Sequence, residues 1–169
     1  MLRAVKHQKQ RKTNASFTIV ASQYNARYVD AMVRAAKAEL RGAGAAVHVI
    51  RVPGAFEIPV VAAALAEQSS LAISGSTPNT THLSAILCFG VIFQGQTSHA
   101  QHIGWGVTHA LAQIQVLHRI PIIHAVFTFE QEEHARVRCL GRNHNRGTEA
   151  ARTALQMAEV MAALQPQGV

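Results

Sequence analysis

The chain has 169 residues and a formal net charge of +7, from 16 lysines and arginines against 9 aspartates and glutamates. This length suits one domain with a real hydrophobic core, and no apolar run reaches the ~20 residues that a membrane-spanning helix needs. Aromatic residues make up only 5% of the chain, while alanine and aliphatic residues are plentiful, which favours an α/β or all-α protein over a β-sandwich.

A basic arm precedes the first apolar segment. Five of the 16 lysines and arginines lie in the first twelve positions, and no uninterrupted apolar stretch follows them, so the arm does not resemble a secretory signal. We expect a disordered arm (1–14) ahead of a single domain (15–169), with contact between the arm and nucleic acid as the alternative. The two cysteines, Cys88 and Cys139, indicate no disulfide framework, and we expect a cytoplasmic protein.

Strand-like and helix-like segments alternate along the rest of the chain. Four apolar segments have the length and composition of strands: 17–22, 46–52, 85–92 and 122–128. Helical spacing of apolar residues follows each of them, at 29–40, from about 59, at 103–117, at 130–138 and at about 148–164. Residues 68–82, rich in Ser, Thr and Gly, are expected to form a surface loop. The core-facing stripe of the third long helix should consist of Ile103, Val107, Leu111, Ile114 and Leu117.

This alternation predicts an α/β fold with a four-stranded, mostly parallel sheet and helices on both faces. Ligands of such sheets bind beyond the carboxyl ends of the strands. Three segments should lie there, namely SQYN (22–25), PGAFE (53–57) and FQGQTSH (93–99).

The third of these segments has the groups that an anion site needs. Gly95 frees the backbone, and Thr97 or Ser98 can cap the following helix, whose N-terminal N–H groups attract anions. His99 falls in the first turn, and histidine is the side chain most often used to move protons. A capped helix with an incidental surface histidine would show the same residues, so this motif alone leaves catalysis open.

Several other signatures are missing from the sequence. It contains no HExxH, no CxxC pair, no GxGxxG, no GxxxxGK[ST] and no GxSxG. Although His99 and His102 share a helix face, the sequence therefore favours neither a metal site, nor nucleotide binding, nor acyl transfer from a serine.

Taken in order, the blocks SQYN, VPGAFEIP, GVIFQGQTSH, PIIHAVFT and R-x7-R-G with NRGTEAA resemble the lumazine synthase family, from about residue 16 to 162. The resemblance implies a flavodoxin-like three-layer sandwich, assembled as pentamers with active sites between neighbouring subunits, some members forming decamers or sixty-subunit shells. It implies a step of riboflavin biosynthesis: condensation of 5-amino-6-(ribitylamino)uracil with 3,4-dihydroxy-2-butanone 4-phosphate to 6,7-dimethyl-8-ribityllumazine, phosphate and water. No cofactor or metal is expected.

The resemblance also assigns roles to residues. His99 matches the histidine that moves protons. Residues implied to bind the pyrimidine and its ribityl chain are Tyr24, Asn25, Ala55, Phe56, Glu57, Val91, Ile92 and His124. Residues implied to bind the phosphate are Gln96 and Thr97, with Arg138 and Arg146 from the neighbouring subunit. For Tyr24 the alternative is a core tyrosine at a strand end, and for the two arginines it is a solvated helix face.

The chain departs from the family pattern at several positions. Gln94 replaces a frequent arginine, residues 100–102 replace an aromatic–acid–aromatic run, His124 replaces a phenylalanine, Val137 a glutamate, and Arg146 a lysine. The central chemical groups remain. These departures nevertheless permit an alternative, a lumazine- or riboflavin-binding protein on the same fold with little catalysis. A more distant alternative is a scaffold whose basic arm gathers nucleic acid.

Overall fold

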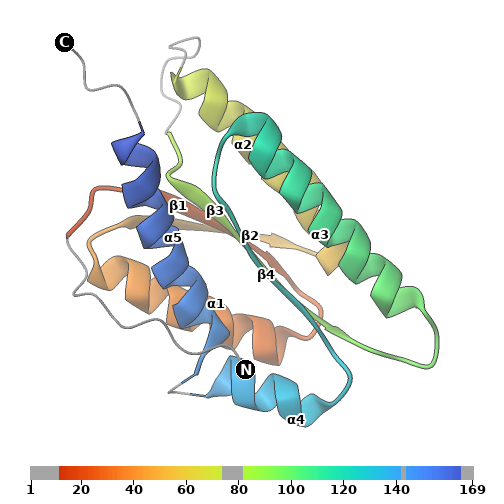
Figure 1. Ribbon diagram of the computed structural model, residues 1–169. Helices are drawn as coiled ribbons and strands as arrows, with labels where there is room; N and C mark the ends of the chain where they lie inside the picture. The colour runs from red at the N-terminus through yellow and green to blue at the C-terminus, as the bar shows by residue number, and fades with distance from the viewer. Residues whose placement is uncertain (1–11, 74–81, 142–143, 165–169) are drawn as a thin grey trace, which may run out of the picture.

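The computed structural model describes residues 12–73, 82–141 and 144–164. The elements follow one another as β1 (Ser16–Ser22), α1 (Ala26–Gly42), β2 (Ala46–Val52), the 3-10 turn η1 (Ala55–Glu57), α2 (Ile58–Ile73), β3 (Ala85–Phe93), α3 (His99–His118), β4 (Ile122–Phe129), α4 (Glu132–Ala135), the π-type turn η2 (Arg136–Leu140) and α5 (Arg146–Ala163) (Figure 1). The predicted alternation of strands and helices is confirmed. The predicted basic arm lies outside the described residues as far as Arg11.

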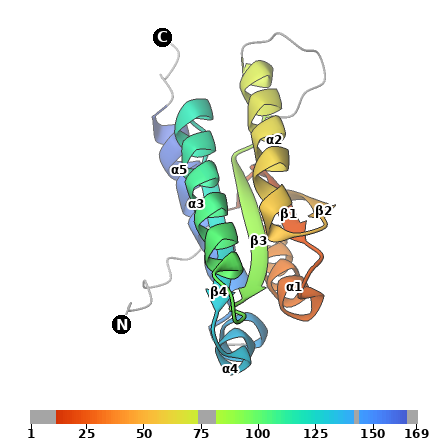
Figure 2. The ribbon, with the colours of Figure 1, turned by 90° about the vertical axis from the view of Figure 1, so that its right-hand side faces the viewer.

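The four strands form one parallel sheet in the order β2-β1-β3-β4. Helices α1 and α5 cover one face and α2 and α3 the other, so the molecule has three layers (Figures 1 and 2). This is the predicted α/β architecture. Among the described residues, no helix has the length and apolar character that crossing a bilayer would require.

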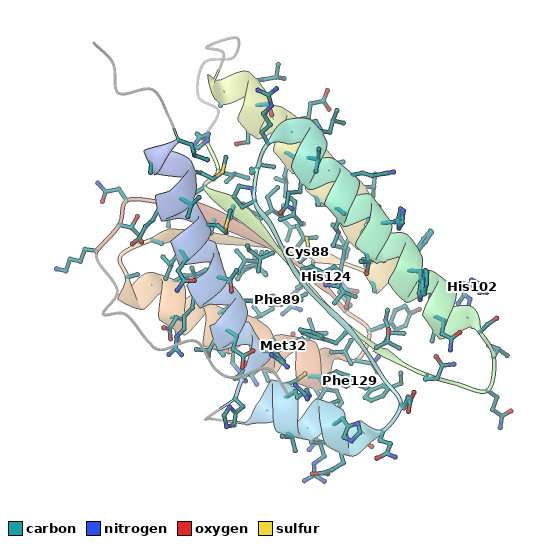
Figure 3. All side chains as sticks on the ribbon, viewed as in Figure 1. Met32, Cys88, Phe89, His102, His124 and Phe129 are labelled. Atoms are coloured by element: carbon teal, nitrogen blue, oxygen red, sulfur yellow. The ribbon has the colours of Figure 1, made fainter. Side chains whose placement is uncertain are left out.

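Both faces of the sheet are buried, which explains why its central strands are almost wholly apolar. On β3, Phe89 packs with Met32 of α1 in the core under α1 and α5, whereas its neighbour Cys88 belongs to the core under α2 and α3 (all three are labelled in Figure 3). Successive side chains of a strand point to opposite faces. A strand covered on both faces therefore shows no alternation of polar and apolar residues.

Helix α2 is longer than predicted, because residues 68–73 continue the helix instead of forming a loop. The hydroxyl of Ser70 donates to the carbonyl of Ala66 at 2.9 Å, and the buried hydroxyl of Ser69 accepts from the Leu83 N–H at 2.9 Å. These partners satisfy side chains that would otherwise compete with helical structure. The rest of the expected loop, 74–81, lies outside the described residues.

The predicted stripe of α3 is correct except at its end. Val107, Leu111 and Ile114 are buried, but Leu117 is 76% exposed. Each residue of an α-helix is rotated about 100° around the axis from the one before it, so Leu117 points about 80° away from the direction of Val107. The stripe drifts around the helix, and Leu117 falls outside it.

Helices α1 and α5 approach closely at Gly147. A Cβ atom there would lie 2.0 Å from the carbonyl oxygen of Met32. The Gly147 N–H donates to Oδ1 of Asn145 at 2.8 Å, which caps α5, and an ion pair between Arg152 and Glu39, at 2.7 Å, joins the two helices further along. The position of α5 on the sheet therefore depends on a residue without a side chain.

Replacing Gly147 with alanine is expected to destabilise the fold by about 1–3 kcal/mol or more, because α5 must move away from α1. Gly42→Ala is the matched control, since a Cβ at Gly42 meets nothing within 4 Å and alanine favours a helix by up to about 1 kcal/mol. Urea unfolding at equal protein concentration measures both. Equal stability of the two variants would contradict this account of the contact.

Candidate active site

The carboxyl ends of β1, β2 and β3 are tied together at one edge of the sheet. The N–H groups of Gln23 and Tyr24 donate to the carbonyl of Pro53, each at 3.2 Å, which fastens the turn after β1 to the end of β2. Nδ2 of Asn25 donates to the carbonyl of Val91 at 2.8 Å, which fastens the same turn to β3. Asn25 has a φ of 56°, a left-handed conformation that asparagine tolerates better than most residues.

Two aromatic side chains at these strand ends stay outside the core. Tyr24 is 71% exposed and Phe56 is 62% exposed. Each lies against a glycine: a Cβ at Gly54 would be 3.3 Å from Cδ2 of Tyr24, and one at Gly106 would be 3.3 Å from Cε2 of Phe56. The alternative of a core tyrosine is therefore wrong, and most of the Tyr24 surface is open to a ligand that can stack on an aromatic ring.

The turn after β2 brings a carboxylate beside Tyr24. One Glu57 oxygen, Oε2, accepts the Gly54 N–H at 2.8 Å, which fixes the side chain. Ala55 is buried against β3, where a Cβ at Gly90 would lie 3.3 Å from its own Cβ. Because Gly90 has no side chain, η1 can lie directly on β3, and Glu57 is held at the strand ends.

Val91 and Ile92 complete this end of β3 with their backbone. Both residues are buried, with exposed fractions of 2% and 9%. The Val91 carbonyl already accepts from Asn25.

The segment between β3 and α3 forms a turn that Gln94 closes. Its Nε2 donates to the carbonyls of Thr97, at 2.8 Å, and Gly95, at 3.1 Å. Gln96 and Thr97 are exposed on this turn, and α3 begins two residues after Thr97, at His99. Its first N–H groups lack intrahelical partners, so they can bind an anion. Gln94, a departure from the family pattern, thus has a structural role.

Of the two residues that could cap α3, Thr97 accepts a hydrogen bond from the helix and Ser98 does not. Ser98 occupies the N-cap position but makes no capping bond; its Oγ lies 3.1 Å from Nε2 of His102, and the Thr97 hydroxyl instead accepts the His99 N–H at a long 3.4 Å. Gly95 has no left-handed φ, and a Cβ there would meet nothing within 4 Å. His99 itself is exposed in the first turn of α3, as expected.

His124 and Arg146 lie elsewhere, along an open groove of about 630 Å³ that is bordered by β4, α5 and the end of α3. Nε2 of His124 lies 2.9 Å from the hydroxyl of Thr108, and desolvation lowers the pKa of His124 below its usual range. The Arg146 guanidinium pairs with Glu149 and lies 5.9 Å from the centre of the Phe127 ring. These residues therefore form a second group, along the strand edge.

Arg138 belongs to η2, the segment that follows β4 and α4, and it is exposed. Within η2, the next residue, Cys139, is buried, and burial raises the pKa of its thiol to about 11. Burial also raises the pKa of the Cys88 thiol, so neither cysteine supplies a thiolate at neutral pH. No group of three or more metal-binding side chains gathers within the described parts of the chain.

Sequence reasoning missed two residues near these groups, Tyr28 and Glu132. The Tyr28 hydroxyl donates to Oε1 of Glu132 across 104 positions of the chain. Tyr28 lies in the apolar pattern of α1, and Glu132 is one of several acidic residues in its segment. No spacing along the sequence could have paired them.

An open parallel sheet with an aromatic ring, a carboxylate and a histidine at its strand ends is typical of an α/β enzyme for small molecules. Comparison with known proteins agrees. Residues 14–162 match the model of the 6,7-dimethyl-8-ribityllumazine synthase family. Similar proteins include the 6,7-dimethyl-8-ribityllumazine synthases of Xanthomonas campestris pv. campestris (strain B100), 34% identical over 89% of this chain and 92% of that protein, and of Stenotrophomonas maltophilia (strain R551-3), 36% identical over 88% and 90%.

The chain therefore belongs to the 6,7-dimethyl-8-ribityllumazine synthase family. It is an enzyme of the transferase class, and its family acts in riboflavin biosynthesis on small-molecule substrates and as an oligomer.

The lowered pKa of His124 predicts a contribution to acid sensitivity. As pH falls through the usual imidazole range near 6.5, the unfolded chain binds the proton first, so acid favours unfolding. Between about pH 7.5 and 5.5, the parent should lose more stability than His124→Phe, which has no group to titrate there. Urea unfolding at both pH values, at one protein concentration, tests this; parallel losses in the two proteins would reject it.

Proposed function

We propose that the chain condenses 5-amino-6-(ribitylamino)uracil with 3,4-dihydroxy-2-butanone 4-phosphate, releasing phosphate and water and forming 6,7-dimethyl-8-ribityllumazine. One observation carries the proposal: an exposed tyrosine and a fixed carboxylate lie at the tied ends of β1 and β2, and an exposed histidine follows the end of β3 at the start of α3. Each of these groups has a use in binding or converting the two substrates.

The pyrimidine substrate binds at the ends of β1, β2 and β3. Its ring stacks on Tyr24, and its ribityl hydroxyls donate to the Glu57 carboxylate. The backbone of residues 55–57 and 91–92 lines the rest of this half, with Phe56 alongside. The observed support is that Tyr24 is open to solvent and that Glu57 is held in place by the Gly54 N–H.

The phosphate of the second substrate binds at the start of α3. The turn of Gln96 and Thr97 and the N–H groups of the helix hold it on one side. Arg138 and Arg146 of a neighbouring subunit approach from the other, since a guanidinium fork matches phosphate oxygens well. His124 of that neighbour lies by the heterocycle.

This division needs active sites between subunits, and we propose a pentamer as the unit of assembly. Two features support a shared interface. An open groove runs along β4, and α3 carries the large exposed apolar side chains of Trp105, Val116 and Leu117. Exposed apolar side chains of this size are typical of surfaces that a partner covers.

The reaction depends mainly on positioning. The amine of the uracil attacks the ketone, and loss of water gives an imine. Loss of a carbon-bound proton and of phosphate gives an enol, which becomes a ketone by moving a proton from oxygen to carbon. The ribitylamino nitrogen then attacks this ketone, and loss of a second water completes the ring. Holding the two reactants in register can lower the barrier by about 7–11 kcal/mol at best, and His99 moves the protons.

A binding protein with little catalysis is not favoured, because the departures from the family pattern have local uses. Gln94 closes the turn before α3, and His124 contacts Thr108. For location we propose the cytoplasm, where the free, buried Cys88 and Cys139 stay reduced.

Replacing His99 with alanine is expected to lower kcat by about 10²–10⁴-fold, because proton transfer loses its carrier. The oligomer should persist, since the side chain is exposed. Lumazine fluorescence measures product formation from the two purified substrates, and light scattering measures assembly. No product from the parent would reject the proposed function, whereas undiminished product from the variant would remove His99 from the mechanism.

Replacing Arg138 with alanine is expected to raise KM for the butanone phosphate by about tenfold or more, through loss of a charged hydrogen bond of about 1.5–3 kcal/mol. KM for the pyrimidine should stay near the parent value. Arg136→Ala is the control: it removes another exposed arginine of η2, one that pairs with Glu133. If both variants change KM for the phosphate substrate alike, Arg138 has no specific role.

A further inference from the structure

We propose that Tyr28 is a positioning residue for Arg138: its hydroxyl, bonded to Glu132, fixes the segment formed by α4 and η2 against α1. The proposal rests on the proposed function in one respect, that Arg138 binds the phosphate. It adds a residue that touches neither substrate and acts through another side chain.

Tyr28 is held by three neighbours. It lies in the first turn of α1 and is only 4% exposed, and its ring meets that of Phe93 edge-on, with centres 5.6 Å apart and planes at 72°. Its hydroxyl donates to Oε1 of Glu132. The Arg27 guanidinium lies 5.8 Å from the centre of the Tyr28 ring, and its NH1 is 4.0 Å from the same Glu132 oxygen. The hydroxyl therefore has a fixed direction.

Glu132 is the first residue of α4, and α4 passes into η2 without a break. A segment this short cannot hold a helical shape by itself, so its geometry depends on what anchors it. Ala135 and Cys139 anchor it in the core, both with no exposed surface. The bond from Tyr28 to Glu132 is a third anchor, at the opposite end from Arg138.

Two anchors leave a segment free to rotate about the line that joins them. A third anchor away from that line prevents the rotation. Ala135 and Cys139 define such a line, and the exposed Arg138 lies between them in sequence, off the core. Rotation about this line would carry the guanidinium sideways. The Tyr28 hydroxyl opposes that rotation, because Glu132 would have to leave it.

The same tyrosine also touches the strand that leads to the anion-binding turn of its own chain, whereas Arg138 serves the site of a neighbour. Phe93, against which the Tyr28 ring packs, ends β3 and is followed directly by Gln94 of the anion-binding turn. As the acceptor of the hydrogen bond, the Glu132 carboxylate raises the pKa of Tyr28, so the hydroxyl remains a donor throughout the neutral range. The contact therefore persists under all ordinary assay conditions.

The test is Tyr28→Phe, which removes the hydroxyl and keeps the ring on Phe93. KM for the butanone phosphate should rise about 3- to 10-fold, as expected for one hydrogen bond to a charged group acting at a distance. The value of kcat and KM for the pyrimidine should stay within about twofold of the parent. Glu132→Gln is the matched variant: it keeps an oxygen that can accept from Tyr28, so it should change KM less.

A double variant separates positioning from general damage. If Tyr28 acts through Arg138, then Tyr28→Phe adds nothing to Arg138→Ala, because the residue to be positioned is gone. Inorganic phosphate binding, measured by calorimetry on the assembled parent, both single variants and the double variant, should follow the same pattern. This second readout needs no turnover, so the inference can be judged even if the parent forms no lumazine.

Three results would overturn the inference. In the first, Tyr28→Phe leaves KM for the butanone phosphate and the affinity for inorganic phosphate at parent values. In the second, it raises KM for both substrates equally; in the third, it weakens phosphate binding as much in the Arg138→Ala background as in the parent. Should Tyr28→Phe fail to assemble, Glu132→Ala with Glu132→Gln as control gives the same comparison from the other side of the bond.

Discussion

The pairing of β1 with both β2 and β3, in parallel, is the constraint on which the rest of the molecule depends. Parallel neighbours end at the same edge of a sheet, so three segments far apart in the sequence meet there. Asn25 then fastens β1 to β3, and the Pro53 carbonyl fastens it to β2. The tyrosine and the carboxylate thus lie together at the strand ends, and the turn after β3 leads from the same end of the sheet to the histidine.

The sequence sufficed for the architecture and for one half of the site, because both depend on local patterns. Apolar runs marked the strands, and polar residues after each run marked the strand ends. It failed where the deciding partner is distant. The hydroxyl of Ser69, in the helical segment 68–73, accepts a hydrogen bond from Leu83, 14 residues away along the chain. The hydroxyl of Tyr28 donates to Glu132, 104 residues away. Leu117 was wrongly predicted to be buried, because the apolar stripe of α3 turns gradually around the helix and position 117 falls outside it.

The candidate site is divided between two surfaces of the chain. Tyr24, Glu57 and His99 lie at the strand ends and at the start of α3, whereas His124 and Arg146 line the groove of β4. The family resemblance implies that Arg146 acts from a neighbouring subunit, so one site can draw on both surfaces. In the proposed assembly each chain completes its neighbour's site, so the two surfaces must be set correctly relative to each other. The first turn of α1 contacts both β3 and α4.

The position of β4 has a consequence for how the protein must be made. Within the described residues β4 pairs only with β3, so its eight residues leave an edge open to any extended chain. A newly synthesised protomer can therefore pair with other extended chains through β4 before it assembles with its own copies. Correct association competes with promiscuous strand addition, and the outcome depends on how fast matching copies meet. At low expression matching copies meet more slowly, so the open edge of β4 stays exposed for longer.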